Sequence, residues 1–371
     1  MILKSLELTD FRNYANVTIP FSEGTNILYG DNAQGKTNIL EAIFLSSTTK
    51  SHKGSKDREI IRFGCGEAHI RTTLLKDNAT YRVDMHLRDK KSKVVAIDSQ
   101  KIKRAAELMG LLNVVFFSPE DLAIIKAGPS ERRRFMDMEL CQLDAAYLHH
   151  LNQYNRAVQQ RNRFLKEMFD TKGSAHWADM LDVFDEQLLE YGSHIIERRE
   201  AFIEELNGVI ASVHRDLTEE KEHLEIRYEP DTDSDEFAQR LGEARERDVF
   251  LKMTSVGPHR DDFSFLLRVD TAQTQFIDLR KYGSQGQQRT AALSLKLSEI
   301  ETVKRVTKEL PVLLLDDVLS ELDANRQNAL LNSIGSLQTI ITCTGLDEFV
   351  NNRFEINKLF KVNNGSVVAE N

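Results

Sequence analysis

Apolar and polar residues alternate in the first third of the chain, and this alternation predicts strands. We expect strands at 2–8 and 14–19, and a buried strand at 25–29. An antiparallel meander is expected at 68–75, 81–87 and 94–97, followed by a short buried strand at 114–117. A helix is predicted from residue 36 to about residue 45, and the polar, basic stretch 46–57 is predicted to be a loop.

The middle of the chain follows a helical period instead. Apolar residues recur three or four positions apart between Leu143 and Met168, and again between Trp177 and Ile210. The break Thr171–Ser174 between them predicts an antiparallel hairpin of two helices, each about 40 to 50 Å long. Helical character begins near Pro129, after a helix start at 118–121, and the acidic stretch Pro230–Glu236 is expected to be a loop and a domain seam.

Strand patterns return after Gly257. Strands are expected at 263–269, 274–279, 312–315 and 339–342, with helices at about 287–306 and 324–334. We therefore expect an N-terminal lobe at 1–127, an inserted helical domain at 128–250 and a C-terminal lobe at 251–371.

Composition restricts the class of protein. The 371 residues are 41% hydrophobic and 29% charged, without an apolar run long enough to span a membrane, so we expect a soluble protein. Three scattered cysteines favour a reducing cytosol, and no signal peptide or structural metal is expected. The net charge is −9, and residues 197–248, with 17 acidic and 8 basic residues, account for all of it. The rest is neutral, so local phosphate-binding faces remain possible.

Residues Gly30–Thr37 match the phosphate-binding loop G-x-x-x-x-G-K-[ST], between a predicted strand and a predicted helix. The glycines let backbone N–H groups point at phosphate oxygens, Lys36 reaches the β- and γ-phosphates, and Thr37 offers its hydroxyl to Mg²⁺. ATP and Mg²⁺ are the expected ligands. The predicted ATP-binding residues of this loop are Gly30, Asp31, Asn32, Ala33, Gln34, Gly35, Lys36, Thr37 and Asn38.

A phosphate-binding loop alone is compatible with kinases, GTPases and several kinds of ATPase. The predicted strand 312–315 ends in Asp316 and Asp317, where the first carboxylate would hold Mg²⁺ and the second would activate water. Ser284-Gln285-Gly286-Gln287 before a predicted helix resembles a second phosphate receptor. In ABC-type ATPases two chains face each other and each supplies this signature to the partner's ATP, so the residues from Ser284 to Gln287 are expected to act across a dimer.

Seven motifs in order resemble the RecF family, bacterial recombination mediators among the ABC/SMC-like ATPases. Besides the phosphate-binding loop, the signature and the stretch 315–323, they are Leu8–Tyr14, Phe116–Leu122, Gly128–Phe135 and Val256–Asp262. The resemblance covers nearly the whole chain. It implies an α/β fold, an ABC-type ATPase head made of a mixed sheet around the phosphate-binding loop plus an antiparallel meander, with an inserted helical domain that contains the hairpin.

The resemblance also implies a function. It implies a cytoplasmic, ATP-binding and DNA-binding protein that forms an ATP-dependent homodimer, works with RecO and RecR to load RecA at gapped DNA, and links to replication restart and SOS induction. By the same resemblance, Arg12 and Asn13 would border the nucleotide, and Ser284 and Asp323 would act across the dimer. Asp317 stands where ABC ATPases usually have Glu, Thr344 where a switch His is usual, and Ser118–Glu120 where a Gln would sense the γ-phosphate. These departures predict slow hydrolysis that acts as a timed switch.

Several alternatives stay open. The basic clusters are either solvated or DNA-binding, and their candidate DNA contacts are Lys50, Lys53, Lys56, Lys90, Lys91, Lys93, Lys103 and Arg104. Arg132–Arg134 is either a solvated face or a contact with DNA or with hairpin acids, and His259–Asp262 is either catalytic or a structural ion-pair turn. The rival functions are the nucleotide-binding subunit of a transporter, which would want a switch His, and a small-molecule kinase, which would need neither Ser284 nor two chains.

Overall fold

The computed structural model describes residues 1–168, 177–269, 275–335, 337–346 and 355–370, and these divide into two compact units. Residues 1–121 and 293–371 form one unit, here called the sheet unit, and residues 122–292 form the helical unit. The first expected domain boundary, 127/128, lies close to this division. The second, 250/251, differs from it, because residues 251–292 group with the helices. The predicted hairpin turn Thr171–Ser174 lies outside the described residues.

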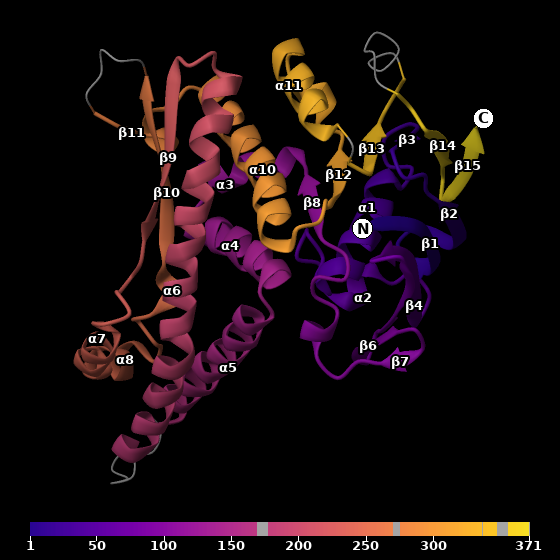
Figure 1. Cartoon of the computed structure of the whole chain (residues 1–371). Coiled ribbons are helices and arrows are strands. Elements are labelled where there is room, and N and C mark those ends of the chain that lie inside the picture. Colours follow the sequence, from indigo (N-terminus) through magenta and orange to yellow (C-terminus); the bar gives the residue numbers. More distant parts are fainter. Residues whose placement is uncertain (169–176, 270–274, 336, 347–354, 371) are drawn as a thin grey trace. The chain divides into compact units, whose positions relative to one another are not determined.

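The sheet unit contains two six-stranded sheets (Figure 1). The first is antiparallel, in the order β2-β1-β4-β5-β6-β7. Its strands are β1 Ile2–Phe11, β2 Tyr14–Pro20, β4 Glu67–Lys76, β5 Ala79–Arg88, β6 Lys91–Ile97 and β7 Gln100–Lys101. The alternating burial of β4 and β5 explains why the meander was predictable, since one face is solvated and the other packs inward.

The second sheet has the order β15-β14-β3-β13-β12-β8 and is parallel except for its edge strand β15. Its strands are β3 Thr25–Tyr29, β8 Val114–Phe117, β12 Val312–Asp316, β13 Thr339–Cys343, β14 Lys358–Asn363 and β15 Ser366–Glu370. The first four were predicted and are confirmed. The hairpin β14–β15 was not predicted, because its exposed strand lacks a regular apolar alternation.

Helix α1 (Lys36–Thr48) contacts strands of both sheets and is buried along nearly its whole length. The helix was predicted, but it continues three residues beyond the expected end, so Ser46–Thr48 are helical and buried. The hydroxyls of Ser46 and Thr48 donate to carbonyls one turn back, which satisfies them inside the core. The remaining helical segments of this unit are α2 Asp57–Ile60, α11 Ala324–Ile334 and the 3₁₀ turns 105–107, 119–121 and 319–321.

The helical unit is built on α5 (Ala145–Met168) and α6 (Trp177–Leu217), which pack together as predicted. Their 24 and 41 described residues correspond to about 36 and 62 Å at the usual helical rise, so the expected 40 to 50 Å was too long for α5 and too short for α6. The other helical elements are α3 Leu122–Lys126, α4 Pro129–Leu143, α7 Phe237–Glu243, α8 Arg245–Leu251, the 3₁₀ turn 258–260, α9 Leu279–Tyr282 and α10 Gln285–Thr307, which contains the unit boundary.

An antiparallel sheet of order β11-β10-β9 packs on α6 through β9. Its strands are β9 Glu222–Glu229, β10 Asp262–Val269 and β11 Ile277–Asp278. The expected strand 274–279 is therefore shorter among the described residues, since Leu279 already begins α9. The predicted loop 230–236 is confirmed, but it does not mark a domain boundary. Asp231 accepts a hydrogen bond from Gly257 N at 3.0 Å and donates its own N–H to Asp261 at 3.0 Å, inside the unit.

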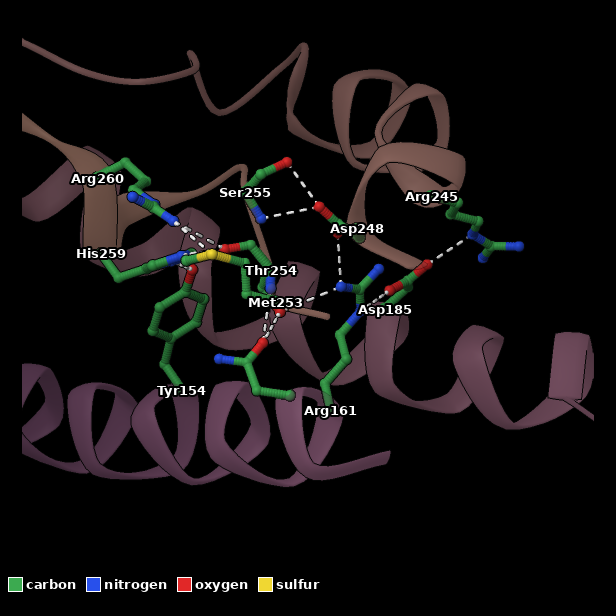
Figure 2. Close-up of polar contacts among 11 residues, drawn as sticks. Tyr154, Arg161, Asp185, Arg245, Asp248, Met253, Thr254, Ser255, His259 and Arg260 are labelled. Atoms are coloured by element: carbon green, nitrogen blue, oxygen red, sulfur yellow. Dashed lines mark hydrogen bonds and ion pairs between the residues drawn. The ribbon is translucent and has the colours of Figure 1, made fainter. Parts of the chain in front are cut away.

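A buried ionic cluster ties α5 to α6 and α8 (Figure 2). Arg161, which is fully buried, donates to Asp185 at 2.8 Å and to Asp248 at 2.6 Å. Arg245 binds the second oxygen of Asp185 at 2.7 Å. Because burial of an unpaired charge is costly, this cluster fixes the lateral position of three helices.

Candidate functional site

The phosphate-binding loop connects β3 to α1, as predicted, and its backbone requires glycine at both ends. Gly30 and Gly35 have φ of 150° and 115°. A Cβ atom would lie 2.3 Å from the Val362 carbonyl at Gly30, and 2.5 Å from the Asn13 side chain at Gly35. Any other residue would therefore open the loop. Asp31, Asn32 and Ala33 are exposed at its mouth.

Lys36 is folded into the loop. Its Nζ donates to the carbonyls of Gly30 at 2.6 Å and Asp31 at 2.8 Å. Burial lowers the pKa of Lys36, whereas the nearby carboxylates of Asp317 and Asp316 act in the opposite direction. The ammonium group thus lies where the loop would surround a phosphate group, held by weak acceptors that an anion can replace.

Thr37 and Asp316 meet although 279 positions separate them in the sequence. Thr37 Oγ1 donates to Asp316 Oδ1 at 2.9 Å, and Thr342 Oγ1 donates to the same oxygen at 2.8 Å. Asp316 pairs in register with Thr342, because β12 and β13 are parallel neighbours. Burial raises the pKa of Asp316, and the hydrogen bonds from the two threonines oppose that rise.

These oxygens fit Mg²⁺. The ion prefers oxygen ligands and commonly takes one or two protein groups, with water and substrate phosphates completing the shell. Thr37 and Asp316 provide one hydroxyl and one carboxylate 2.9 Å apart. Among the described residues, no group of three or more His, Cys, Asp or Glu side chains could hold a metal ion by itself. A metal at this position would therefore depend on nucleotide oxygens.

Asp317, the predicted base, has a strained backbone with φ of 54°. Its N–H donates to Thr342 Oγ1 at 3.0 Å, and Ser320 Oγ donates to its carbonyl at 2.8 Å. Thr342 thus contacts both aspartates of the strand end. Sequence reasoning missed this threonine because only the register of β12 on β13 identifies it.

Asn13 holds the phosphate-binding loop from the adjacent sheet. Its Nδ2 donates to the Gln34 carbonyl at 2.8 Å, and its Oδ1 accepts from Asn38 at 2.9 Å. Tyr14 adds a hydrogen bond from its hydroxyl to the Gly35 carbonyl at 3.0 Å. These contacts hold the backbone of the loop in place. Tyr14 was not predicted to belong to the site.

Arg12, also expected to border the nucleotide, is engaged in an ion pair within the chain. Its guanidinium donates to both carboxylate oxygens of Glu41 on α1 at 2.8 Å, and to Ser55 Oγ at 2.9 Å. Burial alone would raise the pKa of Glu41, but hydrogen bonds from Arg12 and Ser51 outweigh it and hold the pKa below its usual value. In the sequence, the glutamate Glu41 inside the apolar pattern of the predicted helix was the feature that could have indicated this network.

The turn between β14 and β15 is a further support that the sequence did not reveal. Asn364 N donates to Gln34 Oε1 at 2.6 Å, and Gly365 N donates to the Gln34 carbonyl at 3.3 Å. A Cβ atom on Gly365 would lie 2.5 Å from the Asn13 carbonyl. The C-terminal hairpin therefore positions the same loop residue that Asn13 holds.

The signature residues form the start of α10 in the helical unit. Ser284 N donates to Gln287 Oε1 at 2.9 Å, and Gln287 N donates to Ser284 Oγ at 3.2 Å, a reciprocal capping box. Gln287 also donates to Glu222 at 2.8 Å, while Ser284 and Gln285 are exposed. Gly286 is the next helical residue.

Asp323 has a defined role within its own chain. It caps α11, where its Oδ1 accepts from Arg326 N at 3.0 Å, and it forms an ion pair with the Arg326 side chain. Its side chain is half-exposed, so the predicted action across a dimer stays a prediction.

The candidate DNA contacts separate into groups. Those that are exposed are Lys50, Lys53, Lys56, Lys90, Lys91, Lys103 and Arg104. Lys93 is different, because it binds Asp57 at 2.8 Å and the Thr49 carbonyl at 2.7 Å. It therefore connects β6 to the start of α2 and to the end of α1. The charge of Lys53 partly opposes the rise that burial causes in the pKa of Asp316.

Arg132, Arg133 and the His259–Asp262 stretch take part in one hydrogen-bond network of the helical unit. Arg132 is buried and binds both oxygens of Asp262, at 2.6 and 2.8 Å, and Arg133 donates to the Asp261 carbonyl at 2.6 Å. Buried Asp261 in turn accepts from Arg199 at 2.8 Å. The solvated-face and DNA-contact interpretations are wrong for Arg132, and the structural ion-pair interpretation of 259–262 is supported by this network.

A strand, a phosphate-binding loop and a buried helix, with a carboxylate from a parallel strand at the loop, form a nucleotide-binding core. Together with the antiparallel sheet and the inserted helical unit, this core defines an α/β ATPase head of the ABC type. Comparisons agree with this class. Residues 2–367 match the family described as RecF/RecN/SMC N terminal domain. The chain is similar to a crystallised Smc head domain from Pyrococcus furiosus, with a TM-score of 0.56 at 16% identity over 100% of this chain and 96% of that one, a likeness of fold.

Closer relatives identify the family. The protein named "DNA replication and repair protein RecF" of Lachnoclostridium phytofermentans is 59% identical over 99% of both chains, and that of Lachnospira eligens is 57% identical over 100% of both. A solved structure described as the recombination mediator protein RecF-ATP in the RecFOR pathway has a TM-score of 0.90 at 36% identity, covering 100% of this chain and 98% of that one. The chain belongs to the RecF family.

Proposed function

We propose that this protein binds ATP and Mg²⁺ at the phosphate-binding loop and acts in DNA replication and repair as an ATP-gated dimeric clamp on DNA. The observation that carries the proposal is the meeting of Thr37 with Asp316, beside Lys36 inside its loop. The names of the relatives support the pathway, and the similar structure described as RecF-ATP supports the ligand.

ATP binding exchanges hydrogen bonds within the loop. The phosphates accept from the backbone N–H groups at the start of α1 and from Lys36, which gives up the carbonyls of Gly30 and Asp31. Thr37 and Asp316 would hold Mg²⁺, which supplies neutralisation of the charge that develops on the phosphate oxygens. Asn13, Tyr14 and the Asn364–Gly365 turn keep the loop in shape during this exchange.

Hydrolysis is assigned to Asp317. Its carboxylate accepts a proton from water as the water oxygen bonds to the γ-phosphorus and the bond to the leaving ADP oxygen breaks. An aspartate side chain is one methylene shorter than the usual glutamate and Thr344 replaces the usual histidine, so the step is slow. A clamp that must persist on DNA benefits from slow turnover.

Completion of the site requires a second chain. Ser284 and Gln285 are exposed at the N-terminus of the 23-residue helix α10, which is suited to a phosphate. We assign these residues, with Gly286, Gln287 and Asp323, to the ATP of a partner chain. In this scheme ATP closes the dimer on gapped DNA, RecO and RecR cooperate with it to load RecA, and hydrolysis reopens it.

Sedimentation velocity tests the proposal. The full-length protein is compared without nucleotide, with ATP and Mg²⁺, and with both plus a gapped duplex, alongside Lys36→Ala as a control that lacks the phosphate contact. We expect an ATP-dependent dimer that binds DNA and hydrolyses ATP faster on it, and a monomer for Lys36→Ala. A monomer that ignores ATP would contradict the clamp, and fast single-turnover hydrolysis without DNA would contradict the timed switch.

A further inference from the structure

Three side chains connect the end of helix α6 to the signature at the start of α10. Gln287 Nε2 donates to Glu222 Oε1 at 2.8 Å, and His214 Nε2 lies 3.3 Å from Glu222 Oε2. His214 is fully buried in the last turn of α6, and Glu222 is the first residue of β9, with 15% of its side chain exposed. A single carboxylate thus bridges the long helix and the signature, with one oxygen toward each.

This carboxylate determines which way the Gln287 amide faces. Carboxylate oxygens only accept hydrogen bonds, so Glu222 takes the NH₂ end of the amide and leaves its oxygen for Ser284 N, at 2.9 Å. If the amide were reversed, two acceptors would face each other at Glu222 and two donors at Ser284, and both hydrogen bonds would be lost. Glu222 therefore selects the orientation that closes the capping box.

The capping box in turn orients the Ser284 hydroxyl. Its oxygen accepts from Gln287 N at 3.2 Å, so one lone pair is used inside the helix while the hydroxyl proton is left for another acceptor. Ser284 is exposed at the N-terminus of α10. A serine held in this way is suited to donate its proton to a phosphate oxygen.

Strand β9, which carries Glu222, is fixed to α6 at a second point. Asn207 on α6 donates its Nδ2 to the Ile226 carbonyl at 2.6 Å, and its Oδ1 accepts from Ile226 N at 2.8 Å. Every residue of β9 also pairs with a residue of β10. Because the strand is tied to α6 at Asn207 and at His214, Glu222 cannot shift along the helix without loss of these hydrogen bonds.

We propose that Glu222 is a positioning residue for hydrolysis of the partner chain's ATP: it holds Gln287 so that Ser284 presents its hydroxyl to the phosphates. The inference rests on the proposed function, which assigns the signature to the ATP of a second chain. Glu222 acts through Gln287 and Ser284 and not by contact with the nucleotide. Since His214 holds the same carboxylate, the geometry of the signature depends on the end of α6.

Substitutions at Glu222 test this role. Glu222→Leu removes both hydrogen bonds, whereas Glu222→Gln keeps an oxygen that accepts from Gln287 Nε2. Glu225→Leu is the matched control, because Glu225 lies on the opposite face of the same strand with 42% of its side chain exposed. For each variant, single-turnover hydrolysis is measured, together with the binding of a fluorescent ATP analogue at a protein concentration where the chain is monomeric.

We expect Glu222→Leu to lower the rate of hydrolysis by about 10- to 100-fold, since a small displacement of a positioning group costs this much. Its affinity for the ATP analogue should stay at the wild-type value, because Lys36 belongs to the other unit of the chain. Glu222→Gln and Glu225→Leu should both hydrolyse ATP at close to the wild-type rate.

Mixtures of variants show whether the effect reaches ATP through the signature. Glu222→Leu has an intact phosphate-binding loop and Lys36→Ala an intact signature, so their mixed dimer contains one complete site and hydrolysis should recover. A mixture of Glu222→Leu with Ser284→Asn should stay inactive, because neither chain supplies a complete signature. A variant that had only lost stability would behave alike in the two mixtures.

Wild-type hydrolysis by Glu222→Leu, equal behaviour of its two mixtures, or a parallel loss of affinity for the ATP analogue would overturn the positioning role. If Glu222→Leu does not fold, the same mixtures made with Glu222→Asp decide, since this side chain keeps its charge but is one methylene too short to hold Gln287. Failure of Lys36→Ala and Ser284→Asn to complement each other would instead contradict the shared site of the proposed function.

Discussion

At Asp317, the residue assigned to activate water, φ is 54°, a conformation that asparagine tolerates about as well as aspartate. Asp317→Asn therefore removes the base without changing the backbone conformation at this position. We expect hydrolysis to fall by about 10²- to 10⁴-fold, the usual contribution of a general base. Single-turnover hydrolysis measures the fall, and a fluorescent ATP analogue should show nearly unchanged binding. Unchanged hydrolysis would exclude Asp317 as the base.

Glu41 predicts a pH dependence of stability. Its pKa in the folded chain lies below the usual 4.5, since the hydrogen bonds from Arg12 and Ser51 favour the carboxylate. A depressed pKa adds stability that is complete above pH 4.5 and is lost as the pH falls through the folded-state value. We expect Glu41→Gln to lower the free energy of unfolding by about 2 kcal/mol at neutral pH and by progressively less in acid.

Urea unfolding at a series of pH values measures this difference. Glu67→Gln is the control, because Glu67 lies on β4 in the same unit with a largely exposed carboxylate. Its substitution should change the free energy of unfolding by at most about 0.5 kcal/mol. A pH-independent effect of Glu41→Gln would mean that packing, and not charge, holds Glu41 in place.

Among the secondary-structure elements, the C-terminal hairpin has a testable role in nucleotide binding. Gly365→Ala brings a methyl group against the Asn13 carbonyl, at a φ of 78°, while Gly110→Ala meets no atom within 4 Å at a nearly equal φ of 75°. Both substitutions should cost about 1 to 2 kcal/mol of stability from the left-handed backbone. Only Gly365→Ala should also weaken ATP binding, which titration with a fluorescent analogue measures. Equal ATP affinities of the two variants would mean that the hairpin does not contribute to ATP binding.

Two arginines of helix α5, Arg161 and Arg163, are expected to differ strongly in their contribution to stability. Arg161 is buried between Asp185 and Asp248, whereas Arg163 pairs with Glu167 at 81% exposure. We expect Arg161→Met to destabilise the helical unit by about 3 to 5 kcal/mol, because it leaves the buried carboxylate of Asp248 without its cation. Arg163→Met should change stability by less than about 0.5 kcal/mol. Thermal unfolding measures both, and similar midpoints would mean that the buried cluster is dispensable.

At the scale of the whole molecule, the loop residue Lys36 belongs to the sheet unit and the signature residue Ser284 to the helical unit. If ATP is held by Lys36 of one chain and Ser284 of another, two inactive variants should complement each other. Lys36→Ala and Ser284→Asn are suitable, because asparagine still caps a helix. We expect little hydrolysis by either variant and recovered hydrolysis in a mixture, since a mixed dimer contains one intact site. No recovery in the mixture would contradict the shared site.

The sequence by itself determined the features of this protein that are encoded in short stretches of residues. The spacing of Gly30, Gly35 and Lys36 predicts the phosphate-binding loop, since backbone dihedrals and one side chain define it. The strands β3, β8, β12 and β13 were predictable for a similar reason, because a buried parallel strand is a mainly apolar run. The family, too, was evident from motifs in order along the chain.

Tertiary structure decided which distant residues meet. The contact of Thr37 with Asp316, the contacts of Thr342 with both aspartates and the turn at Asn364 depend on strand order and register, which local patterns do not encode. The same holds for charge: Lys93 and Arg132 look like surface cations in sequence, yet each is bound to a carboxylate far along the chain. A local pattern fixes conformation, whereas the partner of a polar side chain is fixed only by packing.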